Sequence, residues 1–265
     1  MAQTTVNSKD NIYMIIHKKY SIILLISILI TFIAISCAQN INVENKTISQ
    51  KMTLADTLYN QGKFNQAKDI YEIITFEGKG DTLVKRAQFQ LANSYYNLDL
   101  YEDAIFEYKQ FVRLFPFSKF SEEANFRTGQ CYYLTSYPPE YDQERTIMAI
   151  NKLKEFKSNY PNSERISKAN QLIKKCINKL LEKKYQNAFI YYRLDDYNAS
   201  LMYLEEIIND SQVNDKILKK SLVLMAKIHM KEYNKNALEG LLIKFNNNFP
   251  KHTYKKIIEK FLNEE

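Results

Sequence analysis

Two stretches of the chain decide the fold, and the second repeats the first 37 residues later. They are Leu54-Ala-Asp-Thr-Leu-Tyr-Asn-Gln-Gly-Lys-Phe-Asn-Gln-Ala-Lys-Asp-Ile-Tyr71 and Leu91-Ala-Asn-Ser-Tyr-Tyr-Asn-Leu-Asp-Leu-Tyr-Glu-Asp-Ala-Ile-Phe-Glu-Tyr108. In each stretch apolar residues recur at helical spacing on both sides of a short polar turn. Alanines stand at matched positions where two helices must approach closely. The pattern therefore predicts a repeated pair of helices.

Three further blocks continue this pattern to the end of the chain. The third carries Gly129 at the small position, the fourth begins with a long helix predicted over 163–192, and the fifth ends at Phe249-Pro250. A terminal helix is predicted over 254–262. The pattern resembles the tetratricopeptide repeat, and we expect an all-α tetratricopeptide-repeat superhelix of about five helix pairs rather than a non-repetitive bundle. We assign repeats 1 to 3 to residues 51–162, and repeats 4 and 5 with the terminal helix to residues 163–265.

The composition agrees with a folded helical protein. Of the 265 residues, 45% are hydrophobic and 25% are charged, while glycine and proline number only 5 each. Sandwiches, barrels and dinucleotide-binding folds need more turn glycines than this. The net charge is +7, but the charges are mixed along the chain without a long basic run. We therefore expect no nucleic-acid partner.

The N-terminal region has the layout of a secretory signal. Lys18 and Lys19 precede an uncharged apolar run over 20–34, and a basic flank followed by such a run is typical of an export signal. The run ends in Ala34-Ile-Ser-Cys37, which resembles the lipobox of bacterial lipoproteins. We assign residues 1–36 to a lipoprotein signal peptide, and we expect Met14 to be the true initiator, so that the signal proper begins there.

Cleavage at the lipobox would leave Cys37 as the new N-terminus. The resemblance implies that this cysteine carries fatty acyl chains, palmitate among them, as the one covalently attached group. The polar segment 37–50 would then be a lipidated tether. The uncharged stretch is also long enough to span a bilayer, so an uncleaved transmembrane anchor remains the alternative.

No motif for chemistry is evident in the sequence. There is no nucleophile elbow, no phosphate-binding glycine loop and no cluster with metal-ligand spacing, so we predict neither an enzyme nor a metal or cofactor site. Asp195 and Asp196 stand in a turn by their context. Cys131 and Cys176 lie on apolar helix faces, which favours core positions over a redox pair.

Several details go beyond a generic repeat protein. Repeats end in Phe115-Pro-Phe-Ser118 and at Pro161, the third repeat contains the insertion Tyr137-Pro-Pro-Glu-Tyr-Asp-Gln143, and the long fourth helix contains Lys179-Leu-Leu-Glu-Lys-Lys184. In these respects the chain resembles the BamD family of outer-membrane assembly lipoproteins. The resemblance implies a lipid-anchored protein of the outer membrane that faces the periplasm. It also implies binding of the barrel-forming subunit BamA, of other assembly-machinery lipoproteins and of unfolded outer-membrane proteins.

The resemblance also suggests where these partners bind. The N-terminal repeats would hold the aromatic-ended substrate signal, and the C-terminal repeats would face BamA. Candidate groove residues are Tyr95, Tyr96, Phe126, Arg127, Tyr132 and Tyr133. Lys179 stands near the place of a basic residue of the BamA-facing half. Two other classes stay open: an envelope lipoprotein that scaffolds cell-wall or division machinery, and an adaptor that delivers peptides to a hydrolase.

Overall fold

The computed structural model describes Tyr20, Leu24, residues 43–78 and residues 80–263. The chain divides into two compact units, Met1–Lys46 and Thr47–Glu265, and the repeats form the second. The predicted signal peptide, its predicted start at Met14 and the predicted lipidation site Cys37 lie outside the described residues, apart from Tyr20 and Leu24. Within the part of the chain that the structure describes, no helix combines the length and the hydropathy needed to cross a bilayer.

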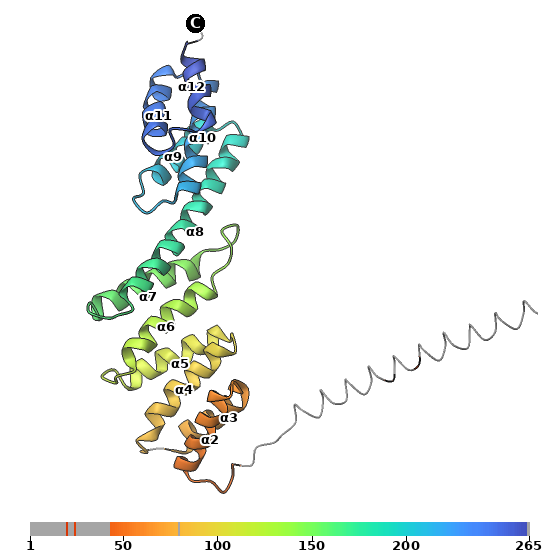
Figure 1. Ribbon diagram of the computed structural model, residues 1–265, viewed down its shortest axis with the longest axis vertical. Coiled ribbons are helices and arrows are strands. Elements are labelled where there is room, and N and C mark those ends of the chain that lie inside the picture. The colour runs from red at the N-terminus through yellow and green to blue at the C-terminus, as the bar shows by residue number, and fades with distance from the viewer. Residues whose placement is uncertain (1–19, 21–23, 25–42, 79, 264–265) are drawn as a thin grey trace, which may run out of the picture. The chain divides into compact units, whose positions relative to one another are not determined.

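The repeat unit consists of helices, and its described residues contain no strand. The helices are α2 (Ile48–Asn60), α3 (Phe64–Glu77), α4 (Leu83–Asn97), α5 (Tyr101–Leu114), α6 (Ser121–Leu134), α7 (Glu144–Asn159), α8 (Ile166–Arg193), α9 (Tyr197–Ile208), α10 (Asp215–Lys231), α11 (Lys235–Asn248) and α12 (Thr253–Asn263). Figure 1 shows them following one another in chain order from α2 to α12.

The helices are arranged as stacked pairs. Each helix from α2 onward packs against the next one in the chain, and first helices of neighbouring repeats also touch, in the contacts α2–α4, α6–α8 and α8–α10. The five pairs are α2/α3, α4/α5, α6/α7, α8/α9 and α10/α11, and α12 covers the end of the stack. This arrangement confirms the predicted tetratricopeptide-repeat fold, in which each repeat buries its core against its neighbours.

The small residues of the repeat lie where helices approach most closely. Ala55, Ala67, Ala92 and Ala104 are fully buried. At Gly129 of the third repeat, a Cβ atom would come within 2.8 Å of the side chain of Leu153 on α7. The glycine is therefore needed because α6 and α7 leave no room there for a methyl group.

Equivalent tyrosines make equivalent hydrogen bonds in the first two repeats. The hydroxyl of Tyr71 donates to Oδ1 of Asp56 at 2.8 Å, and the hydroxyl of Tyr108 donates to Oδ1 of Asn93 at 2.6 Å. Both rings are fully buried. Each bond gives a buried phenol its polar partner, which explains why tyrosine rather than phenylalanine occupies this position.

The turn inside the repeat has the same backbone conformation in four of the five pairs. One residue adopts a positive φ, and these residues are Gly62, Asp99, Asp195 and Tyr233. The residue after it donates its N–H to a carbonyl five positions back, at distances of 2.9, 3.0, 3.0 and 2.9 Å. This is the Schellman ending of a helix. Asp195 therefore has a local structural role, as its sequence context indicates.

Two boundaries depend on side-chain hydrogen bonds. Helix α2 begins at Ile48, inside the segment 37–50 that was predicted to be a tether, because Thr47 and Gln50 form a capping box. In the third repeat, Nε2 of Gln143 donates to the carbonyl of Pro138 at 2.7 Å, and Thr146 donates to Oε1 of Gln143 at 2.7 Å. Gln143 thereby closes the insertion onto the start of α7.

Both described cysteines are core residues. Cys131 and Cys176 are fully buried, in different apolar clusters. Burial raises the pKa of the Cys131 thiol to about 12 and that of Cys176 to about 11. Both therefore stay protonated thiols, which agrees with a packing role.

Candidate functional site

Pairs of tyrosine and a cationic side chain recur along the first helices of the repeats. In each pair the ring comes from one repeat and the cation from the first helix of the next. The pairs are Tyr96–Arg127 at 4.5 Å, Tyr133–Lys179 at 5.3 Å, Tyr185–Lys220 at 3.8 Å and Tyr192–Lys231 at 5.1 Å, measured from the cationic centre to the ring centroid. We call this series the tyrosine–cation row. A cation over an aromatic face is a stabilising contact, and every side chain of the row is half-buried or exposed.

Tyr96 and Arg127 form the first pair of the row, between α4 and α6. Both side chains are half-buried. The guanidinium of Arg127 also pairs with Oε1 of Glu123 at 3.3 Å. This arrangement places a planar cation over a half-buried ring, so a carboxylate and an aromatic group of a ligand can both be contacted at one place.

Tyr95 points to a different environment from its neighbour Tyr96. Its hydroxyl donates to Oε1 of Glu72 at 2.5 Å, and Lys68 lies 5.6 Å from its ring. Burial and the hydrogen bond to Glu72 raise the pKa of Tyr95 above its usual value. The phenol therefore stays neutral and tied to α3.

A second carboxylate, that of Glu107, lies close enough to Tyr95 for its charge to act on the phenol. Burial and the charge of Glu72 raise the pKa of Glu107 to about 7, while a hydrogen bond from Gln88 opposes that rise. Glu72 and Glu107 make the surroundings of Tyr95 acidic. A ligand carboxylate is therefore disfavoured at Tyr95 and favoured at Arg127.

Phe126 lies in the core. It is 2% exposed and packs edge-to-face on Phe156 of α7, with ring centroids 5.5 Å apart. It therefore offers no surface to a ligand, although it was predicted to line the groove. Its burial follows from helical phase, since it is one residue before Arg127 and points about 100° away from it.

Tyr132 of α6 lines a separate pocket, whose other residues come from α5 and α7. The guanidinium of Arg145 lies 5.6 Å from its ring. Together with Phe106, Lys109 and Arg113 these residues border an open pocket of about 570 Å³. Tyr132 thus lies among cationic side chains that sequence reasoning did not single out.

Tyr133 and Lys179 connect the third repeat to the long helix α8. The ammonium group of Lys179 donates to the carbonyl of Ser136 at 3.3 Å and to its hydroxyl at 2.5 Å. Burial lowers the pKa of Lys179. One helical turn later, Lys183 donates to the carbonyl of Glu140 at 2.8 Å. Lys179 therefore positions the insertion, in addition to any contact with a partner.

Groups suited to chemistry are sparse in the part of the chain that the structure describes. Residues 43–78 and 80–263 contain no cluster of three or more His, Cys, Asp or Glu side chains able to hold a metal ion. His229 is largely buried on α10, and burial lowers its pKa despite the nearby Glu232. It stays neutral at pH 7 and packs within the fifth repeat.

Comparison with known protein families identifies the type of protein. The model of the family YfiO, described as an outer membrane lipoprotein, matches residues 44–240. This match runs from the start of the repeat unit into α11. The chain belongs to the YfiO family of outer membrane lipoproteins. This membership confirms the resemblance to the BamD-like lipoproteins that the insertion and the long fourth helix indicated.

One curated relative of this YfiO-family chain carries a functional name. It is the outer membrane protein assembly factor BamD of Rickettsia prowazekii (strain Madrid E), 22% identical over 163 residues. The match covers 59% of this chain and 65% of that protein, so the chain spans just under two thirds of the relative's length.

Two solved structures are similar to this chain over most of its length. A thermophilic TPR protein of Thermus thermophilus has a TM-score of 0.36 and 16% identity, with 82% of this chain and 99% of that chain covered. A tetratricopeptide repeat protein of Parabacteroides merdae ATCC 43184 has a TM-score of 0.38 and 16% identity, with 83% and 84% covered.

The predicted groove residues of the YfiO-family chain thus divide into three groups. Tyr96, Arg127 and Tyr133 belong to the tyrosine–cation row, with Lys179. Tyr95 and Tyr132 face other surroundings, and Phe126 is buried. The row also contains residues that sequence reasoning missed, Tyr185 and Lys220 among them. A signal for them was present, since the tyrosines of α8 at 185 and 192 are seven residues apart and share one helix face.

Proposed function

We propose that this chain is a non-enzymatic assembly factor of the outer membrane, which binds a BamA-like barrel subunit and unfolded outer-membrane proteins and promotes barrel insertion. The observation that carries the proposal is the family match over residues 44–240. The name of the Rickettsia relative, an outer membrane protein assembly factor, points the same way. A stack of helix pairs suits this role because its open faces can hold other polypeptides without changing their covalent structure.

The proposed mode of attachment is a lipid anchor at Cys37, with the repeats on the periplasmic side. Each buried methylene group of an acyl chain contributes about 0.8 kcal/mol to membrane binding, so several chains hold a protein firmly. The segment after Cys37 then acts as a short tether that keeps the repeat unit near the membrane where barrels insert.

Substrate binding is proposed at the pair formed by Tyr96 and Arg127. An aromatic side chain at the end of an unfolded barrel strand packs on the ring of Tyr96, and its terminal carboxylate pairs with Arg127. Removing apolar area from water contributes about 25 cal/mol per Å², so one aromatic side chain supplies a few kcal/mol. Such a contact is weak enough to release the strand to the barrel subunit.

Binding of the barrel subunit is proposed on the C-terminal repeats. The insertion of the third repeat and helix α8 are fixed to one another through Lys179 and Lys183. They form one preorganised surface, and preorganisation lowers the entropic cost of association.

Affinity purification of the tagged full chain from a detergent-solubilised envelope tests this function. We expect a BamA-like barrel subunit and other assembly-machinery lipoproteins to co-purify at fixed ratios. Recovery of cell-wall synthases or division proteins without a barrel subunit would instead support a scaffold of the cell-wall machinery. Co-purification of a hydrolase as the sole stable partner would favour an adaptor role.

A further inference from the structure

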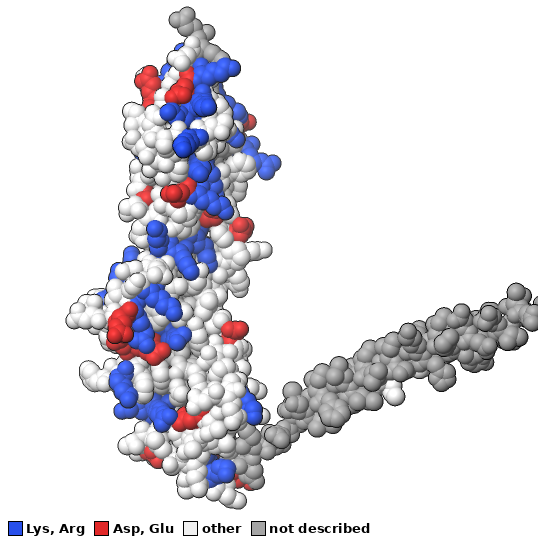
Figure 2. Space-filling view, in the orientation of Figure 1, with Lys and Arg blue, Asp and Glu red and all other residues white. Residues whose placement is uncertain are grey.

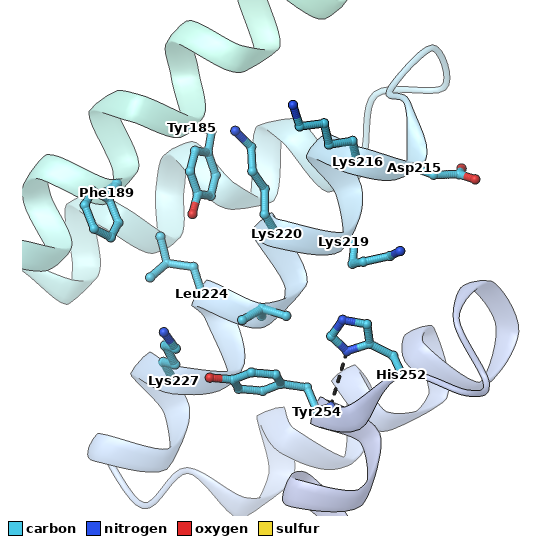
Figure 3. Close-up of a pocket in the computed structure, with 11 residues that line it drawn as sticks. Tyr185, Phe189, Asp215, Lys216, Lys219, Lys220, Leu224, Lys227, His252 and Tyr254 are labelled. Atoms are coloured by element: carbon cyan, nitrogen blue, oxygen red, sulfur yellow. Dashed lines mark hydrogen bonds between the residues drawn. The ribbon is translucent and has the colours of Figure 1, made fainter.

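A second potential binding site lies at the C-terminal end of the repeat unit. An open pocket of about 620 Å³ is lined by residues of α8, α10 and the start of α12 (Figure 3). Tyr185 and Phe189 project into it from α8, and Tyr254 closes its lower side in the view of Figure 3. Its size lies within the range of sites that bind a ligand or a short peptide.

Lysines on one face of α10 give the pocket its charge. Lys216, Lys219 and Lys227 line it, and among the described residues none of their ammonium groups forms a salt bridge. A fourth lysine, Lys220, differs because it pairs with Glu182. Asp215 is the one acidic residue at the rim. Figure 2 shows Lys and Arg side chains outnumbering acidic ones over the C-terminal helices.

The helix dipole does not account for the lysines at the start of α10. Lys216 and Lys219 stand in the first two turns of α10, which begins at Asp215. The N-terminus of a helix carries partial positive charge, so lysine is unfavourable there and acidic residues are preferred. The positive potential of the helix end thus adds to that of the lysines.

Apolar side chains lie between the charged ones. Leu224 and Val223 separate the first lysines from Lys227 along α10, and both line the pocket. Phe189 lines the same pocket and is 41% exposed. The ammonium group of Lys219 lies 5.0 Å from the ring centroid of Phe249, and that of Lys227 lies 6.0 Å from the ring centroid of Tyr254. The site therefore offers cations at both ends and an apolar surface between them.

The spacing of the lysines indicates the kind of ligand. From position 216 to position 227 the helix rises about 16 Å, at 1.5 Å per residue. An extended peptide covers that distance with about five residues. We infer that this pocket binds an extended acidic peptide segment whose acidic residues flank one aromatic or aliphatic side chain. A single phosphate group would reach the lysines at one end only.

A binding measurement on the full chain tests this inference. The chain is purified in detergent, and fluorescence anisotropy follows a labelled, blocked peptide of about seven residues with glutamates at both ends and a central phenylalanine. We expect the triple variant Lys216→Gln, Lys219→Gln, Lys227→Gln to lower the association constant about tenfold or more. The control removes the same charge from exposed lysines elsewhere, with Lys85→Gln, Lys154→Gln and Lys168→Gln, and should bind as the unmodified chain does.

The apolar half of the site has its own test. Phe189→Ala should weaken binding of the phenylalanine peptide about threefold or more, yet leave binding of an alanine-centred version unchanged. The inference would be overturned if the pocket variant and the control variant lost the same amount of affinity. It would also be overturned if a peptide with lysines at both ends bound as tightly as the glutamate-ended peptide.

A lipid is the other chemistry that such a surface can attract. A third outcome would also overturn the inference and show a lipid site instead. In that outcome vesicles containing phosphatidylglycerol bind in a way that depends on Lys216 and Lys227, and the acidic peptide does not bind. Because the probe is synthetic, these outcomes are independent of whether the chain takes part in barrel assembly.

Discussion

The ammonium group of Lys179 lies 2.5 Å from the hydroxyl oxygen of Ser136 and fastens the long helix α8 to the insertion of the third repeat. The two residues are 43 positions apart in the chain. Gln186 continues the attachment by donating to Oε1 of Glu140 at 2.9 Å. Together these contacts link the N-terminal and C-terminal repeats. The contact with Ser136 makes Lys179 a positioning residue for the surface around it.

Replacing Lys179 by methionine should loosen the insertion. The variant loses a charge-assisted hydrogen bond and leaves Ser136 without its donor, so we expect unfolding to require about 1–2 kcal/mol less free energy. Hydrogen exchange should rise at the backbone amides of Ser136, Tyr137 and residues 140–143. The control is Lys174→Met on the exposed side of the same helix. Unchanged exchange in Lys179→Met would show that the insertion is held by other contacts.

Glu107 should make the protein less stable as the pH rises. Burial, with the charge of Glu72 next, raises its pKa from 4.5 to about 7 in the folded chain. Between these values the folded state binds more protons than the unfolded state, so stability falls with increasing pH and stays lower above about pH 7. We expect Glu107→Gln to raise the free energy of unfolding by about 1–2 kcal/mol near pH 8 and to have little effect near pH 4.

Urea titrations at the two pH values measure this difference. Glu164→Gln removes an exposed carboxylate that forms no salt bridge in the described structure and should change stability little at either pH. A stabilisation by Glu107→Gln that is equal at both pH values would contradict the raised pKa.

Two glycines in helices should respond to alanine in opposite directions. At Gly129 a methyl group would meet Leu153 at 2.8 Å, whereas at Gly240 nothing lies within 4 Å. We expect Gly129→Ala to destabilise the protein by about 1–3 kcal/mol through overpacking. Gly240→Ala should stabilise it by up to about 1 kcal/mol, since alanine favours the helix. Thermal unfolding of the two variants tests the close approach of α6 and α7, and a stabilised Gly129→Ala would contradict it.

Much of the fold could be predicted from the sequence because every repeat has the same pattern of residue types. Helical spacing of apolar residues, alanines at close approaches and a repeated polar turn all agree. The left-handed residue of the turn was less evident, since Gly62, Asp99 and Tyr233 share a conformation but not a side chain. Their common feature is the backbone hydrogen bond that ends the first helix.

The site was harder to predict than the fold. Tyr95 and Tyr96 are adjacent in sequence, yet helical geometry turns them about 100° apart, so one faces Glu72 and the other Arg127. Which side is open depends on how the next repeat stacks. The number of residues between each tyrosine of the row and its cationic partner varies from pair to pair, because the insertion and the long α8 change the spacing. The tyrosine–cation row therefore became evident only in three dimensions.

Arg127 should determine how the chain recognises the end of a peptide. We expect Arg127→Gln to lower affinity for an aromatic-ended peptide with a free carboxylate about three- to tenfold. Affinity for the same peptide with an amidated end should stay the same. Arg193→Gln, on an exposed part of α8, serves as the control in the same fluorescence titration. An equal loss for both peptides would assign Arg127 a structural role through Tyr96 and Glu123.

The level of folded outer-membrane barrels after depletion of this chain tests its assembly role most directly. Heat-modifiable migration on gels separates folded from unfolded porin-like proteins in the envelope of the cells that produce it. The proposed function predicts that folded barrels decline as the chain is depleted, and that re-expression of the unmodified chain restores them. Normal levels of folded barrels after complete depletion would contradict it.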